Sequence, residues 1–346
     1  MTRLWSPASC RRQHLEIASA RGPVVPAVSR ARRRPLWICL ALLLVLTNGA
    51  AAQPPDSEPS GAKSLADQEP ITPIPPPPKA DPRKLALGER LFSDHRLSAD
   101  GKLACSSCHD LRTNGAGGGQ TAAHDGSKPP FDTLTIFNAT LSFRLNWEGN
   151  FRNLGAHTES SLENPVNMRT SVDEVLRKLN ADPQMVQQFR AAYGRAPDRT
   201  SFLDAVATFE RSLLTPGSRF DRWLGGDASA LSPQELGGYQ LFKSLGCSSC
   251  HQGVNVGGNL LERQGVFRPL VPGKPEIVRV PSLRNVATTP PYFHDGSAPT
   301  LDEAVRKMAA AQLDRTLTDQ QVESLVAFLK TLTGTYRGVA VVGASQ

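Results

Sequence analysis

The sequence has few cysteines, methionines and aromatic residues, and no apolar run long enough to cross a membrane. Its 346 residues include 6 cysteines, 4 methionines and 6% aromatic residues. The longest apolar stretch, residues 36–47, has about twelve residues, whereas a membrane-spanning helix needs about twenty. Few segments alternate apolar and polar residues as strands do. These absences argue against a spanning helix and against a fold built from strands.

The N-terminal region is typical of a secretory signal peptide. Arg30 and Arg32–Arg34 precede the apolar run, and the small residues Ala50–Ala52 follow it. We therefore predict a signal peptide over residues 1–52, cleavage near Ala52 and a periplasmic mature protein. A membrane anchor is the alternative, for which the apolar run is short.

The basic character of the chain comes from this leader. Residues 1–52 contain eight arginines and one glutamate, a net charge of +7, and the whole chain also carries +7. The mature part is therefore close to neutral, so its charge predicts no nucleic-acid partner.

Every cysteine outside the leader belongs to a C-x-x-C-H motif, and the two motifs are Cys105, Cys108, His109 and Cys247, Cys250, His251. This motif is a c-type haem attachment signature, because two thiols at i and i+3 reach both vinyl groups of one porphyrin and the next imidazole lies under the iron. No cysteine remains for a disulfide. A zinc site would not need the two histidines, and a thioredoxin-like pair would need a βαβ setting. We predict two covalent c-type haems with His109 and His251 as iron ligands.

The mature chain divides into two units that resemble each other. The segment LGERLFSDHRLSADGKLACSSCH opens the first, and GGYQLFKSLGCSSCH opens the second. We expect a Pro-rich flexible linker over residues 53–82, or else a strap on the folded body. After it we expect an N-terminal cytochrome c domain over 83–225, a C-terminal cytochrome c domain over 226–338 and a tail over 339–346. The predicted fold is mainly α, with long Gly/Pro-rich loops packed around each haem.

Helix starts are clearly marked. Capping boxes are formed by Ser171 with Glu174, Ser232 with Glu235, Thr300 with Glu303, and Thr318 with Gln321. Asp182-Pro183 opens a helix that runs toward Tyr193, and residues 200–213 and 318–332 carry apolar residues at helical spacing.

The segment 280–313, VPSLRNVATTPPYFHDGSAPTLDEAVRKMAAAQL, resembles the C-terminal signature of bacterial dihaem cytochrome c peroxidases. In that family a methionine of the final helix binds the high-potential, electron-storing haem, and the match falls on Met308. Without the resemblance, Met308 is interpreted as a core residue. The resemblance also places His294 near this haem.

The resemblance extends to the first half of the chain. His124 has the family spacing for the distal histidine of the low-potential, peroxidatic haem, and Trp147 matches the tryptophan between the two haems. A surface histidine and a core tryptophan are the alternatives. The family's interdomain calcium ligands fall on Asp132, Thr289 and Pro291. A carboxylate at Asp132, where the family usually has Asn, keeps a hard oxygen ligand.

The sequence departs from the family at the catalytic carboxylate. Twenty residues after Trp147 the family peroxidases carry a glutamate that moves protons beside the open iron, and here Asn167 occupies that position. The neighbouring family Gln and Pro positions are His157 and Ser161. An amide holds a water or peroxide but cannot carry a proton, so His157 or Glu163 is the candidate substitute.

The resemblance implies an oxidoreductase that reduces hydrogen peroxide with electrons from a small donor such as a cytochrome c or a cupredoxin. Members of the family are often dimers, so a homodimer is among the expectations. Two alternatives remain open. One is a dihaem enzyme that oxidises a protein or an organic molecule, like the maturation enzyme of methylamine dehydrogenase, whose Tyr ligand Met308 would replace. The other is a plain dihaem electron carrier, which would not bind cyanide when half-reduced.

Overall fold

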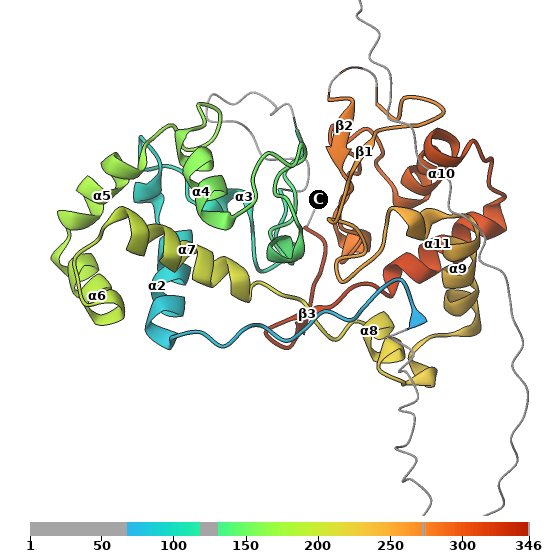
Figure 1. Cartoon of the computed structure of the whole chain (residues 1–346), viewed down its shortest axis with the longest axis horizontal. Helices are drawn as coiled ribbons and strands as arrows, with labels where there is room; N and C mark the ends of the chain where they lie inside the picture. The colour runs from blue at the N-terminus through green and yellow to red at the C-terminus, as the bar shows by residue number, and fades with distance from the viewer. Residues whose placement is uncertain (1–67, 118–130, 272, 274, 345–346) are drawn as a thin grey trace, which may run out of the picture. The chain divides into compact units, whose positions relative to one another are not determined.

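The structure is a computed structural model that describes residues 68–117, 131–271, 273 and 275–344, and it is mainly helical (Figure 1). The first half contains α2 (Pro82–Phe92), α3 (Cys105–Cys108), α4 (Leu154–Glu163), α5 (Val172–Asn180), α6 (Pro183–Tyr193) and α7 (Arg199–Ser212). The second half contains α8 (Arg219–Leu224), α9 (Pro233–Ser244), α10 (Leu301–Leu313) and α11 (Asp319–Lys330). Two antiparallel pairs join β1 (Leu261–Arg263) to β2 (Ile277–Arg279) and β3 (Thr335–Tyr336) to β4 (Val339–Ala340). The predicted mainly α fold is confirmed, and none of the helices in the described ranges is both long and apolar enough to span a bilayer.

The predicted helix starts are confirmed. The side-chain oxygens of Ser171, Ser232, Thr300 and Thr318 each accept a hydrogen bond from the backbone N–H three residues later. Asp182 caps α6 in front of Pro183. Each of these contacts satisfies a backbone donor that a helix N-terminus otherwise leaves free.

In each half two helices that are distant in sequence cross, α2 with α7 and α9 with α11 (Figure 1), and a glycine lies at each crossing. A Cβ atom on Gly88 in α2 would lie 2.1 Å from the carbonyl oxygen of Ala205 in α7. A Cβ atom on Gly238 in α9 would lie 1.9 Å from the carbonyl oxygen of Ser324 in α11. Only glycine permits so close an approach of two backbones. The repeat seen in the sequence is therefore a repeat of one helix crossing.

A second repeated feature joins the two halves. Asn138 and Asn285 both adopt the left-handed conformation, with φ of 61°. The side-chain oxygen of Asn138 accepts from the Thr215 N–H at 2.9 Å, and that of Asn285 accepts from the Gly334 N–H at 3.0 Å. Both side-chain amides also donate to the Thr215 hydroxyl, at 2.8 and 3.0 Å. The two copies therefore meet at one buried threonine.

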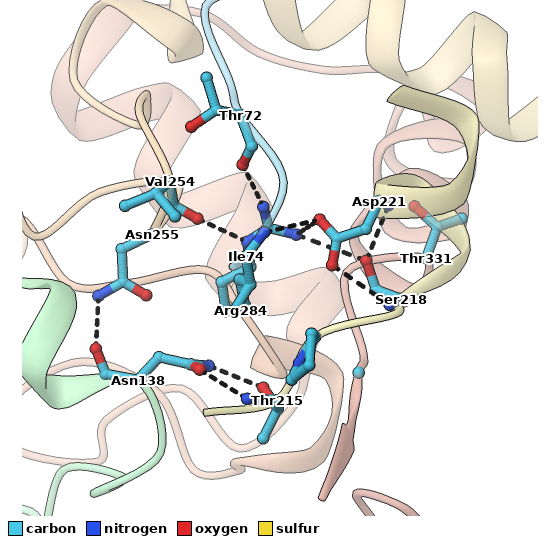
Figure 2. A network of polar contacts seen from close by, with 12 residues as sticks. Thr72, Ile74, Asn138, Thr215, Ser218, Asp221, Val254, Asn255, Arg284 and Thr331 are labelled. Carbon is cyan, nitrogen blue, oxygen red and sulfur yellow. Dashed lines mark hydrogen bonds and ion pairs between the residues drawn. The ribbon is translucent and has the colours of Figure 1, made fainter. Parts of the chain in front are cut away.

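A buried ion pair fixes the core of the second half (Figure 2). The side chain of Arg284 is completely buried, and its guanidinium lies 2.8 Å from the carboxylate of Asp221. The same guanidinium donates to the carbonyl oxygens of Thr72 at 2.8 Å and Val254 at 2.9 Å. These contacts give the buried charge both a counter-charge and neutral acceptors, which such a charge requires.

Residues 69–74 of the Pro-rich segment lie on the folded body as a strap. Ile71 and Ile74 are buried, and Ile71 belongs to the core of the second half. The carboxylate of Glu69 accepts from the Tyr239 hydroxyl at 2.6 Å and from the Lys243 ammonium at 2.8 Å. Residues 69–74 therefore take the strap arrangement that the composition left open.

Candidate functional site

The first C-x-x-C-H motif begins in α3 and ends at the residue that follows it. Cys105 and Cys108 lie one helical turn apart, and neither is in a disulfide. The Nδ1 atom of His109 lies 2.9 Å from the carbonyl oxygen of Gly115. Because a carbonyl oxygen only accepts hydrogen bonds, Nδ1 carries the proton and Nε2 keeps its lone pair for a metal.

The second motif repeats this arrangement. Cys247 lies in a 3₁₀ turn, Cys247–Ser249, and Cys250 and His251 follow it. The Nδ1 atom of His251 lies 3.3 Å from the carbonyl oxygen of Val256, which again leaves Nε2 as the free nitrogen. His251 is buried, and burial lowers its pKa to about 4, so its ring is neutral at pH 7.

The four thiols are not arranged as a metal cluster. Burial raises the pKa of Cys105 to about 12 and that of Cys247 to about 11, so neither is a thiolate at pH 7. Within the described ranges, no group of three or more His, Cys, Asp and Glu side chains is placed to hold a metal ion. This arrangement argues against the zinc alternative.

The second motif opens onto a largely apolar cavity of about 250 Å³. Cys247, Cys250 and His251 line one part of it. Helix α10 lines another part with a stripe at helical spacing, made of Leu301, Ala304, Val305, Met308 and Gln312. Met308 is thus brought to the same cavity as His251, as the resemblance predicted for the two axial ligands of one haem.

The two halves exchange contacts at the edge of this cavity. The Trp147 indole N–H donates to the carbonyl oxygen of Asp132 at 2.8 Å, and the Asp132 N–H donates to the carbonyl oxygen of His294 at 2.7 Å. The rings of Trp147 and His294 meet edge to face, with centroids 6.2 Å apart. Trp147 therefore lines the cavity at His251 although it comes from the first half of the chain.

Comparison with known proteins identifies the family. Residues 82–229 match the family model for di-haem cytochrome c peroxidase, and residues 237–333 match the model for cytochrome c. The chain is 38% identical over 294 residues to cytochrome c551 peroxidase of Nitrosomonas europaea, which covers 80% of this chain and 87% of that protein. The chain belongs to the di-haem cytochrome c peroxidase family. It is therefore an oxidoreductase of the cytochrome c peroxidase type with two haems, as predicted.

Two further relatives agree with this assignment. Cytochrome c peroxidase Ccp of Escherichia coli is 38% identical over 287 residues, and the match covers 78% of this chain but 62% of that longer protein. The crystal structure of a MauG-like protein associated with microbial copper homeostasis is similar with a TM-score of 0.64 and 27% identity, over 75% of this chain and 93% of that one.

Both sites fit a c-type haem of this di-haem cytochrome c peroxidase. Each offers two free thiols three residues apart and an imidazole with an available Nε2. The apolar walls of the cavity at His251 suit a porphyrin face, and Met308 supplies a thioether there.

The structure shows where His157, Asn167 and Glu163 lie, the three residues that bear on the missing family carboxylate. His157 lies in the middle of α4, and its ring packs edge to face on Phe151 with centroids 5.4 Å apart. It lies near enough to His109 for an electrostatic interaction between the two rings. Burial, with the charges of His109 and Arg279, lowers the pKa of His157 to about 4. Asn167 is exposed in the turn after α4, and Glu163 at the end of α4 is exposed as well. Of the two candidate substitutes, His157 is the one placed near His109.

The remaining predicted residues divide into two groups. His124 lies outside the described residues. The three predicted calcium ligands Asp132, Thr289 and Pro291 line the same cavity as Trp147 and His294. Calcium itself stays a prediction.

Besides the Arg284–Asp221 pair, two buried charged residues were not predicted from the sequence. Arg279 is 6% exposed on β2, and Glu210 is 8% exposed on α7 near Cys105. Burial raises the pKa of Glu210 to about 8, so it is protonated at pH 7. A hint of each residue is present in the sequence. Glu210 follows Phe209 inside a helical apolar pattern, and Arg279 directly precedes the VPSLRN segment.

Proposed function

We propose that this chain is a periplasmic peroxidase that reduces hydrogen peroxide to water with electrons from a small redox protein, a cytochrome c or a cupredoxin. The contact between Trp147 of the first half and His294 of the second half carries the proposal, because it brings aromatic rings from both halves together at the cavity of His251, with centroids 6.2 Å apart. Relatives at 35% and 38% identity that are named cytochrome c551 peroxidase support this substrate and this type of donor.

The overall reaction consumes one peroxide, two electrons and two protons and yields two waters. The haem at His251 would store an electron and the haem at His109 would supply the iron that binds peroxide. Cys105, Cys108, Cys247 and Cys250 would hold these groups through thioether bonds, and His109, His251 and Met308 would ligate the irons. Trp147 provides a π-system where the first half meets the second, beside the cavity at His251.

His157 is the group of this chain that we assign to proton transfer. Its neutral imidazole accepts the proton from one peroxide oxygen and returns it to the other oxygen, which leaves as water. Asn167 cannot do this because an amide has no proton to exchange at neutral pH. We also propose that His124 ligates the His109 haem before activation and that Asp132, Thr289 and Pro291 bind a calcium ion, which metal analysis of the purified protein would detect.

The exported protein tests the proposal directly. We expect mature protein that begins after Ala52 and carries the mass of two porphyrins that denaturation does not remove. We expect it to consume peroxide in the presence of a reduced cytochrome c or cupredoxin, after partial reduction. Absence of porphyrin mass would refute haem attachment. Turnover no higher than that of free haem would refute the peroxidase function alone.

Replacing Met308 with histidine tests its role as a ligand. Two imidazoles hold a haem at lower potential than an imidazole with a thioether. We therefore expect a redox titration of the Met308→His protein to show one haem shifted to lower potential and the other unchanged. The control is Gln312→His, one turn further along the same face of α10. Equal potentials in wild type and Met308→His would contradict ligation by Met308.

A second candidate function is the oxidation of a protein or an organic molecule by peroxide. The exposed Asn167, where peroxidases of the family carry a carboxylate, favours it. Peroxide consumption that requires an added organic or protein substrate, and that a small redox donor does not support, would favour this alternative.

A further inference from the structure

Arg279 is a buried cation without a carboxylate. Its side chain is 6% exposed, and burial lowers its pKa only to about 10, so it is charged at pH 7. Its guanidinium donates to the carbonyl oxygen of Asn146 at 3.0 Å and reaches the hydroxyl of Ser142 at 3.5 Å. Both partners are neutral, and across the described ranges no Asp or Glu pairs with it. A buried charge in this situation is unfavourable unless an anion pairs with it.

The neighbouring buried arginine shows what this chain does when it supplies the anion itself. Arg284, five residues later, has Asp221 at 2.8 Å as well as its neutral acceptors. Arg279 uses only part of its five N–H donors and has no equivalent of Asp221. The missing partner of Arg279 is therefore an anion that no described Asp or Glu of the chain supplies.

Strand geometry gives the direction in which Arg279 points. Val278 and Val280 line the cavity at His251, and Arg279 lies between them. Because successive side chains of a strand point to opposite faces, the guanidinium points away from that cavity. It points toward the loop of Ser142 and Asn146, which belongs to the first half, and its charge reaches His157 near His109.

The internal repeat leads to the same assignment. Asp132 and Arg279, Asn138 and Asn285, and Trp147 and His294 are each separated by 147 residues. The Asp132 N–H donates to the His294 carbonyl at 2.7 Å, and the Arg279 N–H donates to the Trp147 carbonyl, also at 2.7 Å. Asp132 comes from the first half and lines the cavity of the second haem site. Arg279, its equivalent in the second half, therefore belongs to the first haem site.

We propose that Arg279, supplied by the second half of the chain, binds a propionate carboxylate of the haem attached at Cys105 and Cys108. A guanidinium pairs with a carboxylate through two parallel hydrogen bonds, which suits a planar, buried, anionic partner. The pair makes the first haem site complete only when the two halves are assembled. This inference rests on haem attachment and not on the reaction that the protein catalyses.

Redox titration of both haems across pH tests the pair in the intact two-haem protein. In Arg279→Gln the loss of a cation favours the ferric form, so the reduction equilibrium of the His109 haem should fall at least tenfold at pH 8, which is 59 mV for one electron. The unpaired propionate should also take up a proton on reduction, which gives this haem a new pH dependence. The His251 haem should keep its potential. Arg112→Gln is the control, because it removes an exposed cation three residues from His109, where solvent screens it.

Infrared difference spectra provide a second measurement that does not depend on a charge-removing variant. With haem labelled with ¹³C at its propionate carboxylates, Arg279→Lys should shift the labelled carboxylate band, because an ammonium cannot form the bidentate pair. A shift confined to unlabelled bands would identify a different carboxylate, such as a bound small acid, as the partner and overturn the proposal. An unchanged potential of the His109 haem in Arg279→Gln, or a change only in the His251 haem, would overturn it too.

Discussion

Replacing His157 with alanine is expected to lower peroxide turnover by about 100- to 10,000-fold, the usual contribution of a general acid–base group. The reason is that Asn167 has replaced the carboxylate of the family, and of the two candidate substitutes, His157 and Glu163, His157 is the one that lies near His109. Steady-state kinetics with a reduced donor measure the effect. Peroxide affinity of the half-reduced protein should change far less than turnover, because His157 is assigned to proton transfer.

Two further variants show whether the loss is specific. His95→Ala removes an exposed histidine that bonds only to a nearby backbone carbonyl, and it should leave turnover unchanged. Asn167→Glu in the His157→Ala background restores the carboxylate that the family carries at this position and should recover part of the lost rate. Full activity of His157→Ala would show that the proton moves by another route.

The rate of peroxide turnover is expected to fall at low pH. The pKa of His157 is lowered to about 4, so its ring is neutral and able to accept a proton above that pH. As pH falls through about 4 the ring becomes protonated and the rate should fall with it. The rate should be nearly constant from about pH 5 to neutrality, and in His157→Ala this acidic decline should disappear.

Replacing Asp221 with asparagine is expected to reduce the free energy of unfolding by about 3–5 kcal/mol. The substitution preserves shape but leaves the fully buried Arg284 guanidinium without its counter-charge, and breaking a buried ion pair from one side typically costs this much. The Asp221 carboxylate also accepts from the Ile74 N–H at 3.4 Å, so the strap should loosen as well. Urea denaturation followed by circular dichroism measures the first effect, and limited proteolysis within residues 69–74 measures the second.

The control for this prediction is the same substitution in an exposed pair. Asp314 lies 2.8 Å from Arg268, and both side chains are more than half exposed, so Asp314→Asn should cost less than about 1 kcal/mol. The double variant Asp221→Asn with Arg284→Met removes both charges and should be more stable than Asp221→Asn alone. Equal stability of Asp221→Asn and Asp314→Asn would show that the buried pair contributes nothing beyond a surface pair.

The helices were predictable because their signals are local. Ser171, Ser232, Thr300 and Thr318 each cap a helix through a backbone N–H three residues away, so the whole interaction is contained in four residues. The long loops were recognised as loops, but their contacts were not predicted. The Thr215 hydroxyl accepts from two asparagines 77 and 70 residues away, and no local pattern specifies that meeting.

The candidate site was predictable to the same extent. The C-x-x-C-H motifs and the resemblance identified His109, His251, Met308 and Trp147, and the structure brings Met308 and Trp147 to the cavity at His251. Arg279 was not predicted because a single arginine in a sequence is normally exposed, and the partners of its buried guanidinium, Asn146 and Ser142, lie in the other half of the chain.

The sequence predicts where two haems attach, and it correctly predicted where the main helices begin and to which family the chain belongs. These properties depend on residues three or four positions apart, or on motifs that are contiguous in the sequence. Other properties became visible only in the folded structure. Gly88 and Gly238 permit the two helix crossings, Arg284 forms a buried ion pair with Asp221, and Arg279 pairs with no described Asp or Glu. The physical reason is that burial and pairing of a charge are set by residues that are distant in the chain and adjacent only after packing.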